Sequence, residues 1–132
     1  TNFEALKDEF SKNTNILFRG KVSNVNEYLH ASDVYLATSK SEGLPNGVLE
    51  AMACGCAVIC SNSGGVNEFV VTGENCLTFE PKDEDALIKA IMRLANDEAL
   101  RKSLALHGVE TAEKFRWEES AKQMLSVINQ SI

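Results

Sequence analysis

The sequence predicts an α/β protein built on a parallel, Rossmann-like sheet with helices on its faces. Short apolar runs alternate along the chain with segments whose apolar residues recur at helical spacing. The apolar runs lie at residues 16–20, 34–39, 57–61 and 77–79. Strands that alternate with helices form parallel sheets joined by right-handed crossovers. About four strands are expected, fewer than the six of a complete dinucleotide-binding sheet.

Length and composition fit one small globular domain. The chain has 132 residues, of which 44% are hydrophobic, and a net charge of −6. Such a charge repels a nucleic-acid backbone, so we expect no nucleic-acid partner. No apolar run approaches the roughly 18 residues that cross a bilayer, and no signal-peptide pattern is found. We expect a cytoplasmic protein that can lie at the inner face of the membrane, with any membrane contact made by segments outside this sequence.

The first third of the chain predicts two helices and two strands. Apolar residues at helical spacing indicate a surface helix from about 2 to 12, and residues 16–20 follow as a strand. A short helix at 25–32 is expected to turn three side chains inward: Val25, Tyr28 and Leu29. The run at 34–39 is rich in β-branched and apolar residues, which indicates a strand buried on both faces.

The middle of the chain predicts a helix between two further strands. The helix runs from about 46 to 54, and Gly55 can end it in the left-handed conformation that glycine adopts easily. The strand at 57–61 has the composition of a buried one. The Gly64-Gly65 pair that follows fits either a tight turn before a short helix or a loop that a ligand can approach closely. Residues 77–79 are the last strand.

The rest of the chain predicts three helices. Asp83 and Asp97 can each accept a hydrogen bond at a helix start, and His107-Gly108 is interpreted as a helix end. A last helix from about Trp117 carries apolar residues at positions 121, 124, 125 and 128. We expect these stripes to be core, with Trp117 either anchoring the last helix in it or packing an interdomain surface.

Four cysteines do not form a metal or disulfide pattern. Cys54-Gly55-Cys56 lacks the spacer usual in zinc sites, and His30 and His107 lie far from it in sequence. Cys56 and Cys60 flank an apolar strand, where thiols behave as small hydrophobic groups. We interpret the cysteines, with Cys76, as structural thiols of a reducing compartment.

Two glutamates eight positions apart, Glu42 and Glu50, carry the strongest functional signal. They flank a loop and the start of the helix at 46–54, where Asn46 is a good N-cap and the first amides favour an anion. Carboxylates beside an anion site suit a ligand with hydroxyl groups, such as a nucleotide sugar. Taken alone, the two residues equally fit a solvated loop glutamate and a glutamate that complements the helix dipole.

Several segments together resemble one family: the carboxy-terminal, donor-binding domain of retaining glycosyltransferases of the GT-B architecture, family 4 type. The resemblance runs from about Ile16 to Val127. Its most specific part is the pair of glutamates with seven residues between them, followed by Ala51-Met52-Ala53-Cys54-Gly55. Supporting matches are Phe18-Arg19-Gly20-Lys21-Val22, Ser32-Asp33-Val34, Ser39, Gly64-Gly65-Val66-Asn67-Glu68 and Phe115-Arg116-Trp117.

The resemblance implies roles for eight residues. It implies that Glu42 is the catalytic residue at the hydroxyls of the donor sugar and that Glu50 binds the ribose. The residues along the sugar and diphosphate are implied to be Gly43, Leu44, Pro45 and Asn46. Lys21 and Val22 are implied near the base, although Lys21 also fits a solvated surface charge. The nucleotide sugar is the co-substrate, and no metal or other cofactor is implied.

The resemblance also implies that residues 1–132 are a single partial domain. The family's donor domain opens with two strands and an Arg/Lys pair that do not precede Thr1, and the amino-terminal acceptor domain is missing too. We therefore expect the strand at 16–20 either to pair directly with that at 34–39 or to be joined to it by another chain. We expect the full-length protein to be a transferase of polysaccharide biosynthesis and this chain alone to be inactive. Alternatives are a non-catalytic sugar-nucleotide-binding or assembly module and a nucleotide-sugar epimerase.

Overall fold

A three-stranded parallel sheet forms the centre of the protein in the computed structural model, which describes residues 3–10, 12–13, 15–38 and 46–131. The strands are β1 (Val34–Ala37), β2 (Ala57–Ser61) and β3 (Leu77–Phe79), in the order β1-β2-β3. Val34 pairs with Ala57, and Ile59 pairs with Leu77. The predicted Rossmann-like α/β class is confirmed.

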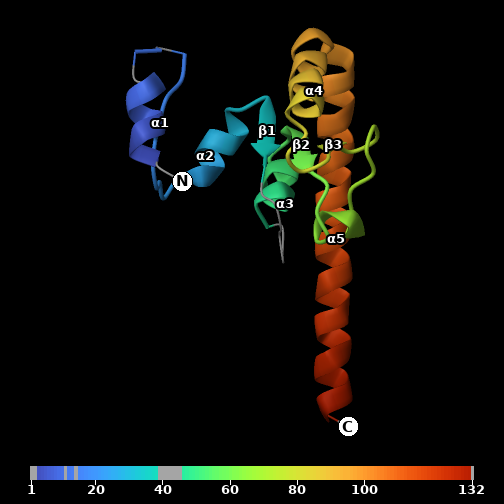
Figure 1. Cartoon of the computed structure of the whole chain (residues 1–132). Coiled ribbons are helices and arrows are strands. Elements are labelled where there is room, and N and C mark those ends of the chain that lie inside the picture. Colours follow the sequence, from blue (N-terminus) through green and yellow to red (C-terminus); the bar gives the residue numbers. More distant parts are fainter. Residues whose placement is uncertain (1–2, 11, 14, 39–45, 132) are drawn as a thin grey trace.

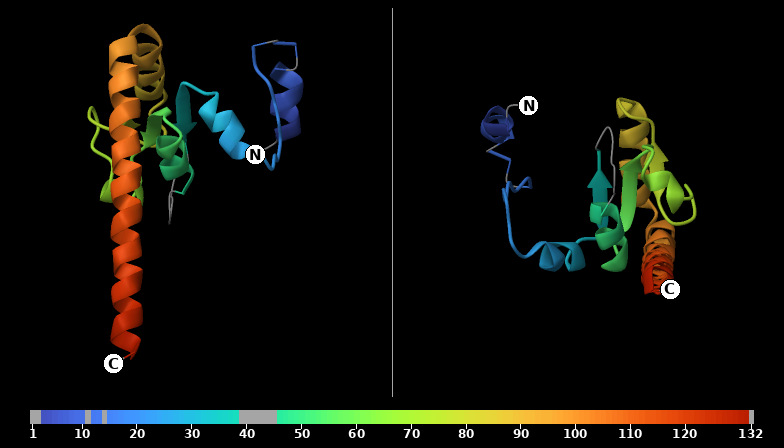
Figure 2. Two further views of the ribbon diagram at one scale, coloured as in Figure 1. Left: turned by 180° about the vertical axis from the view of Figure 1, so that it is seen from behind. Right: turned by 90° about the horizontal axis from the view of Figure 1, so that it is seen from below.

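Helices complete the described chain. They are α1 (Phe3–Phe10), α2 (Val25–His30), α3 (Asn46–Ala53), α4 (Glu84–Asn96) and α5 (Glu98–Ser131), with a short 3-10 helix, η1, at Val66–Glu68. Figures 1 and 2 show that α5 passes alongside the sheet and continues well beyond it, while α1 and α2 lie on the other side of β1.

Alternate residues of β2 divide the core into two layers. Val58 and Cys60 belong to a cluster with residues of α3, including Met52. Ala57 and Ile59 belong to a second cluster, with residues of α4 and the first turns of α5. Every residue of β2 is buried, as predicted, because helices cover both faces of this central strand.

Helix ends follow the sequence signals closely. The Asp83 carboxylate accepts a hydrogen bond from the Ala86 amide at 3.0 Å, and Asp97 accepts one from the Leu100 amide at 2.9 Å. Gly55 has a φ of 83° and ends α3. The Gly55 amide donates to the Met52 carbonyl at 3.0 Å, and the Cys56 amide donates to the Ala51 carbonyl at 3.1 Å. This pair of hydrogen bonds is the Schellman arrangement. These three predictions are confirmed.

The cysteines are buried or half-buried free thiols, as interpreted from the sequence. The Cys56 thiol donates to the Leu29 carbonyl at 3.1 Å, and burial raises its pKa. A hydrogen bond between the Cys60 and Cys76 thiols, together with burial, raises the pKa of Cys76. Cys56 and Cys76 therefore fill the core around α3 as neutral thiols.

The predicted strand at 16–20 is wrong. These residues form no regular structure, and Ile16 and Leu17 are 40% and 66% exposed. They do not pair with β1, so the expectation that these two runs join directly is wrong as well. An apolar run becomes a strand only when a neighbouring strand accepts its hydrogen bonds, and in the described part of the chain β1 pairs with β2 alone.

Burial beside this edge is also lower than predicted. Val34 and Leu36 are about two-fifths exposed, so β1 is covered on one face only. In α2, only Leu29 is buried, whereas Val25 and Tyr28 are exposed. The periodicity identified the apolar side chains, but within the described residues too few elements lie over this end of the sheet to cover them.

The carboxy-terminal region is one helix of 34 residues, so the predicted end at His107-Gly108 is wrong. A Cβ atom at Gly108 would lie 3.3 Å from Met52 Cγ, which is a tight contact. This glycine therefore lets α5 approach α3 closely instead of ending the helix.

The last turns of α5 are not core. Trp117 is 77% exposed, Met124 65% and Ile128 51%. The predicted core role of Trp117 and of the last apolar stripe is therefore wrong, because this part of α5 extends past the sheet (Figure 1). Packing of Trp117 against another domain stays a prediction.

Candidate nucleotide-binding site

The first turn of α3 lies at the carboxyl end of the strands. This helix follows β1 along the chain, and all three strands are parallel, so its start faces the edge at which open α/β sheets bind ligands. Asn46 is the first residue of α3, in agreement with the predicted start. The start of α3 therefore lies where sheets of this kind bind ligands.

Close contact with β1 fixes this turn. A Cβ atom added at Gly47 would lie 2.8 Å from the Tyr35 hydroxyl, closer than real Cβ contacts allow. Val48 is 3% exposed, and Ala51 and Met52 are fully buried beneath the helix. A small residue at position 47 and an apolar stripe on one face hold α3 against the sheet.

A cavity of about 240 Å³ opens between α3 and α5. Three residues of the first two turns of α3 and three of α5 line it: Asn46, Leu49, Glu50, Ala112, Phe115 and Arg116. The walls include the aromatic ring of Phe115, whose centroid lies 5.5 Å from that of Phe69 at a tilted angle. Two charged groups, the Glu50 carboxylate and the Arg116 guanidinium, thus share a partly apolar cavity.

Both charged side chains are exposed. Neither Glu50 nor Arg116 forms an ion pair or a side-chain hydrogen bond with another described residue. Ionised carboxylate accepts hydrogen bonds from hydroxyl groups, and guanidinium donates to anionic oxygens. The cavity can therefore recognise hydroxyl groups and an anion on one molecule.

The structure brings together two of the sequence-predicted site residues, Asn46 and Glu50. Glu42, Gly43, Leu44 and Pro45 lie outside the described residues. Lys21 and Val22 do not line the cavity, and the segment between α1 and α2 that contains them runs apart from α3 (Figures 1 and 2).

Sequence reasoning missed the α5 wall of the cavity. Phe115 and Arg116 were noted only as part of a match to the family. The available signal was spacing: Ala112, Phe115 and Arg116 fall on one face of a helix at i, i+3 and i+4. This face packs against α3 because α5 continues through Gly108 as one helix.

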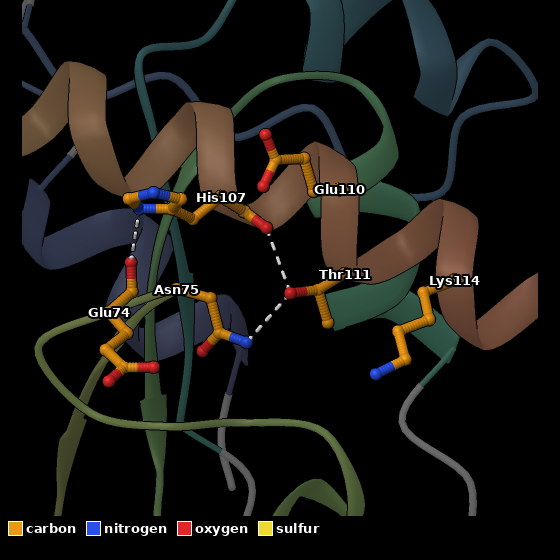
Figure 3. Close-up of a pocket in the computed structure, with 6 residues that line it drawn as sticks. All are labelled: Glu74, Asn75, His107, Glu110, Thr111 and Lys114. Atoms are coloured by element: carbon orange, nitrogen blue, oxygen red, sulfur yellow. Dashed lines mark hydrogen bonds between the residues drawn. The ribbon is translucent and has the colours of Figure 1, made fainter.

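A second cavity, of about 500 Å³, lies against α5 where the turn before β3 docks (Figure 3). His107 Nδ1 lies 3.1 Å from the Glu74 carbonyl, to which it donates. The side-chain amide of Asn75 donates to the Thr111 hydroxyl at 3.0 Å and to the Phe69 carbonyl at 2.8 Å. These contacts attach the turn to α5, so its polar groups are engaged in structure.

The described residues contain neither a candidate metal site nor a candidate membrane-spanning helix. Among them, no group of three or more His, Cys, Asp or Glu side chains could hold a metal ion. In the same part of the chain, no helix is both long and apolar enough to cross a membrane.

The fold is that of the carboxy-terminal domain of GT-B glycosyltransferases. Sucrose-phosphate synthase from Thermosynechococcus elongatus superposes with a TM-score of 0.83 and 33% identity, over 96% of this chain and 33% of that one. The carboxy-terminal domain of the group 1 glycosyl transferase LpcC from Francisella tularensis gives 0.72 and 30%, over 84% and 58%. HepE of Anabaena, in complex with UDP and glucose, gives 0.80 at 21%, over 94% and 35%, which is a likeness of fold alone.

Residues 2–97 match the family described as Glycosyl transferases group 1, and the chain belongs to that family. It is 35% identical over 104 residues to an uncharacterized glycosyltransferase of Methanocaldococcus jannaschii, covering 79% of this chain and 30% of that protein. It is 34% identical over 102 residues to the O-antigen chain mannosyltransferase B of Escherichia coli, covering 75% and 26%. The chain thus spans less than a third of the length of these relatives.

Proposed function

We propose that this chain is the donor-binding part of a retaining glycosyltransferase that transfers a sugar from a nucleotide sugar to an acceptor. The observation that carries the proposal is the position of Glu50, in a cavity at the carboxyl end of the sheet, in a member of a glycosyl transferase family. Glu50 accepts hydrogen bonds from the ribose hydroxyls, and Asn46 lies towards the diphosphate at the start of α3.

The remaining assignments rest on the resemblance. Glu42 is assigned to the hydroxyls of the donor sugar, Gly43 to Pro45 to the sugar and diphosphate, and Lys21 with Val22 to the base. The nucleotide complex of HepE supports a nucleotide donor because that protein has the same fold. The E. coli mannosyltransferase supports a role in polysaccharide biosynthesis, which is cytoplasmic or at the inner membrane face in this proposal.

In the proposed reaction, the bond between the anomeric carbon and a diphosphate oxygen breaks, and the acceptor oxygen bonds to the same face of that carbon. The leaving diphosphate takes the proton of the acceptor hydroxyl. Positioning and charge stabilisation supply the catalysis, with no metal or cofactor required. The acceptor lies on a domain outside this sequence, so this chain alone is expected to bind donor weakly and to transfer no sugar. Turnover of a nucleotide sugar by the purified chain would contradict that expectation.

Replacement of Glu50 tests the site directly. Glu50→Ala removes charge-assisted hydrogen bonds worth roughly 1.5–3 kcal/mol, so the dissociation constant of the nucleotide should rise more than tenfold. Ligand-observed NMR with UDP, GDP and ADP measures this dissociation constant. For the chain alone we expect it to be roughly millimolar. Glu110→Ala is the matched control, since it removes a carboxylate of α5 that lines the second cavity. Equal affinity of the Glu50 variant and the parent would remove Glu50 from the site.

A non-catalytic sugar-nucleotide-binding or assembly module and a nucleotide-sugar epimerase are the alternative functions. The Glu-Gly-Leu-Pro segment at 42–45 favours transfer over epimerisation, and retention of both glutamates favours it over a module without a reaction. Joining this chain to its acceptor-binding domain and assaying sugar release and epimer formation separates the three.

A further inference from the structure

Arg116 extends the face of α5 that packs against α3. Gly108 contacts Met52, Ala112 is 5% exposed, and Arg116 follows at the same four-residue spacing. Residues spaced by four lie above one another on one helix face. The packing of Gly108 and Ala112 therefore fixes the position of the Arg116 backbone. It places Arg116 on the wall of the cavity opposite Asn46 and Glu50.

The cavity contains opposite charges that do not neutralise each other. Glu50 and Arg116 line the same space without forming an ion pair, and neither has another side-chain partner among the described residues. A structural role for Arg116 would predict a bond to a carboxylate or a carbonyl, as Arg101 makes to the Leu94 carbonyl at 2.9 Å. Among the described residues, the Arg116 guanidinium makes no such bond.

The chemistry of the walls defines that molecule. A guanidinium binds phosphate oxygens through two parallel hydrogen bonds, whereas a carboxylate selects hydroxyl groups. Leu49, Ala112 and Phe115 add apolar surface between them. At about 240 Å³ the cavity is smaller than the roughly 300–1,000 Å³ of a complete ligand pocket, so it accommodates part of a ligand. A ribose with its adjoining phosphate has the required groups and size.

We propose that Arg116 is a further donor-binding residue, which contacts the phosphate next to the ribose that Glu50 holds. This inference rests on the proposed function, and it adds a contact from α5 to a site otherwise assigned to α3 and its preceding loop. The two helices then recognise the nucleoside diphosphate together, with the hydroxyls on one side and the charge on the other.

Matched ligands and matched variants test the inference. Affinities for UDP, GDP and ADP are compared with those for uridine, guanosine and adenosine, which lack phosphates. Arg116→Ala should weaken nucleoside diphosphate binding about fivefold to tenfold and leave nucleoside binding unchanged. Arg116→Lys should lie between, because lysine keeps the charge without the two-pronged geometry. Lys114→Ala removes the same charge from α5 outside this cavity and should bind as the parent does.

The outcomes separate the two proposals. If the parent chain binds none of the nucleoside diphosphates, both the proposed function and this inference are overturned. If the parent binds one and Arg116→Ala binds it equally well, only the inference is overturned. Equal losses for the nucleoside, or from Lys114→Ala, also overturn it, since these indicate misfolding or a general charge effect. Circular dichroism confirms that each variant remains folded.

Discussion

Adding one methyl group at Gly47 should strain the contact between α3 and β1. The new Cβ atom would lie 2.8 Å from the Tyr35 hydroxyl oxygen, and the next atom of that ring lies at 3.8 Å, an ordinary contact distance. The clash therefore involves a single atom. Overpacking of this kind costs about 1–3 kcal/mol, while alanine gains about 1 kcal/mol over glycine in a helix. Gly47→Ala alone should lower the free energy of unfolding by about 0–2 kcal/mol.

Removing that atom should reverse the effect. In a Tyr35→Phe background the methyl group meets no atom of the described residues closer than 3.8 Å, so Gly47→Ala should become neutral or stabilising. The double-mutant cycle isolates the clash. The effect of helix propensity at position 47 is the same with tyrosine or phenylalanine at position 35, and any other loss from Tyr35→Phe is the same with glycine or alanine at position 47, so both cancel. We expect a coupling free energy of about 1–3 kcal/mol.

Urea unfolding followed by circular dichroism measures the four corners of the cycle. Gly64→Ala is the control, since a Cβ atom there has no neighbour within 4 Å in the part of the chain that the structure describes. Its effect should be the same with tyrosine or phenylalanine at position 35. A coupling free energy near zero for Gly47 would show that α3 does not approach β1 as described, and the position of the cavity at the start of α3 would lose its support.

Two further predictions concern stability. Asp83→Ala should lower the free energy of unfolding by about 1 kcal/mol, because the Ala86 amide loses its cap. Asp85→Ala is the control, since this residue of the same helix caps no amide. Equal effects of the two changes in urea unfolding would contradict the role of Asp83 as a cap. Burial raises the pKa of Cys56 above its ordinary 9.0, so the stability it contributes is present below pH 9 and lost as the pH rises further. Urea midpoints between pH 8 and 10 should fall less steeply for Cys56→Ala than for the parent, and parallel curves would refute the assignment.

Much of the fold follows from local sequence signals. The strands at β2 and β3 and the helix at α3 were predicted at their observed positions, because period and composition reflect burial directly. The caps at Asp83 and Asp97 depend on amides three residues away, and they too were predicted. For the site, Glu50 was singled out from its place at a strand-to-helix junction, and Asn46 was implied by the family resemblance; both line one cavity.

Other features depend on contacts between segments far apart in the sequence, so they became known from the folded chain. Residues 16–20 have the composition of a strand, but among the described residues no strand of the sheet pairs with them. Gly108 has the signal of a helix end, yet its lack of a side chain serves contact with Met52, 56 positions earlier in the chain. Local patterns were enough to show which residues are apolar, cap helices or carry charge. Their neighbours, including the cavity that Glu50 shares with Arg116, were set by how α5 crosses α3, because a local pattern contains no information about which distant surface will cover it.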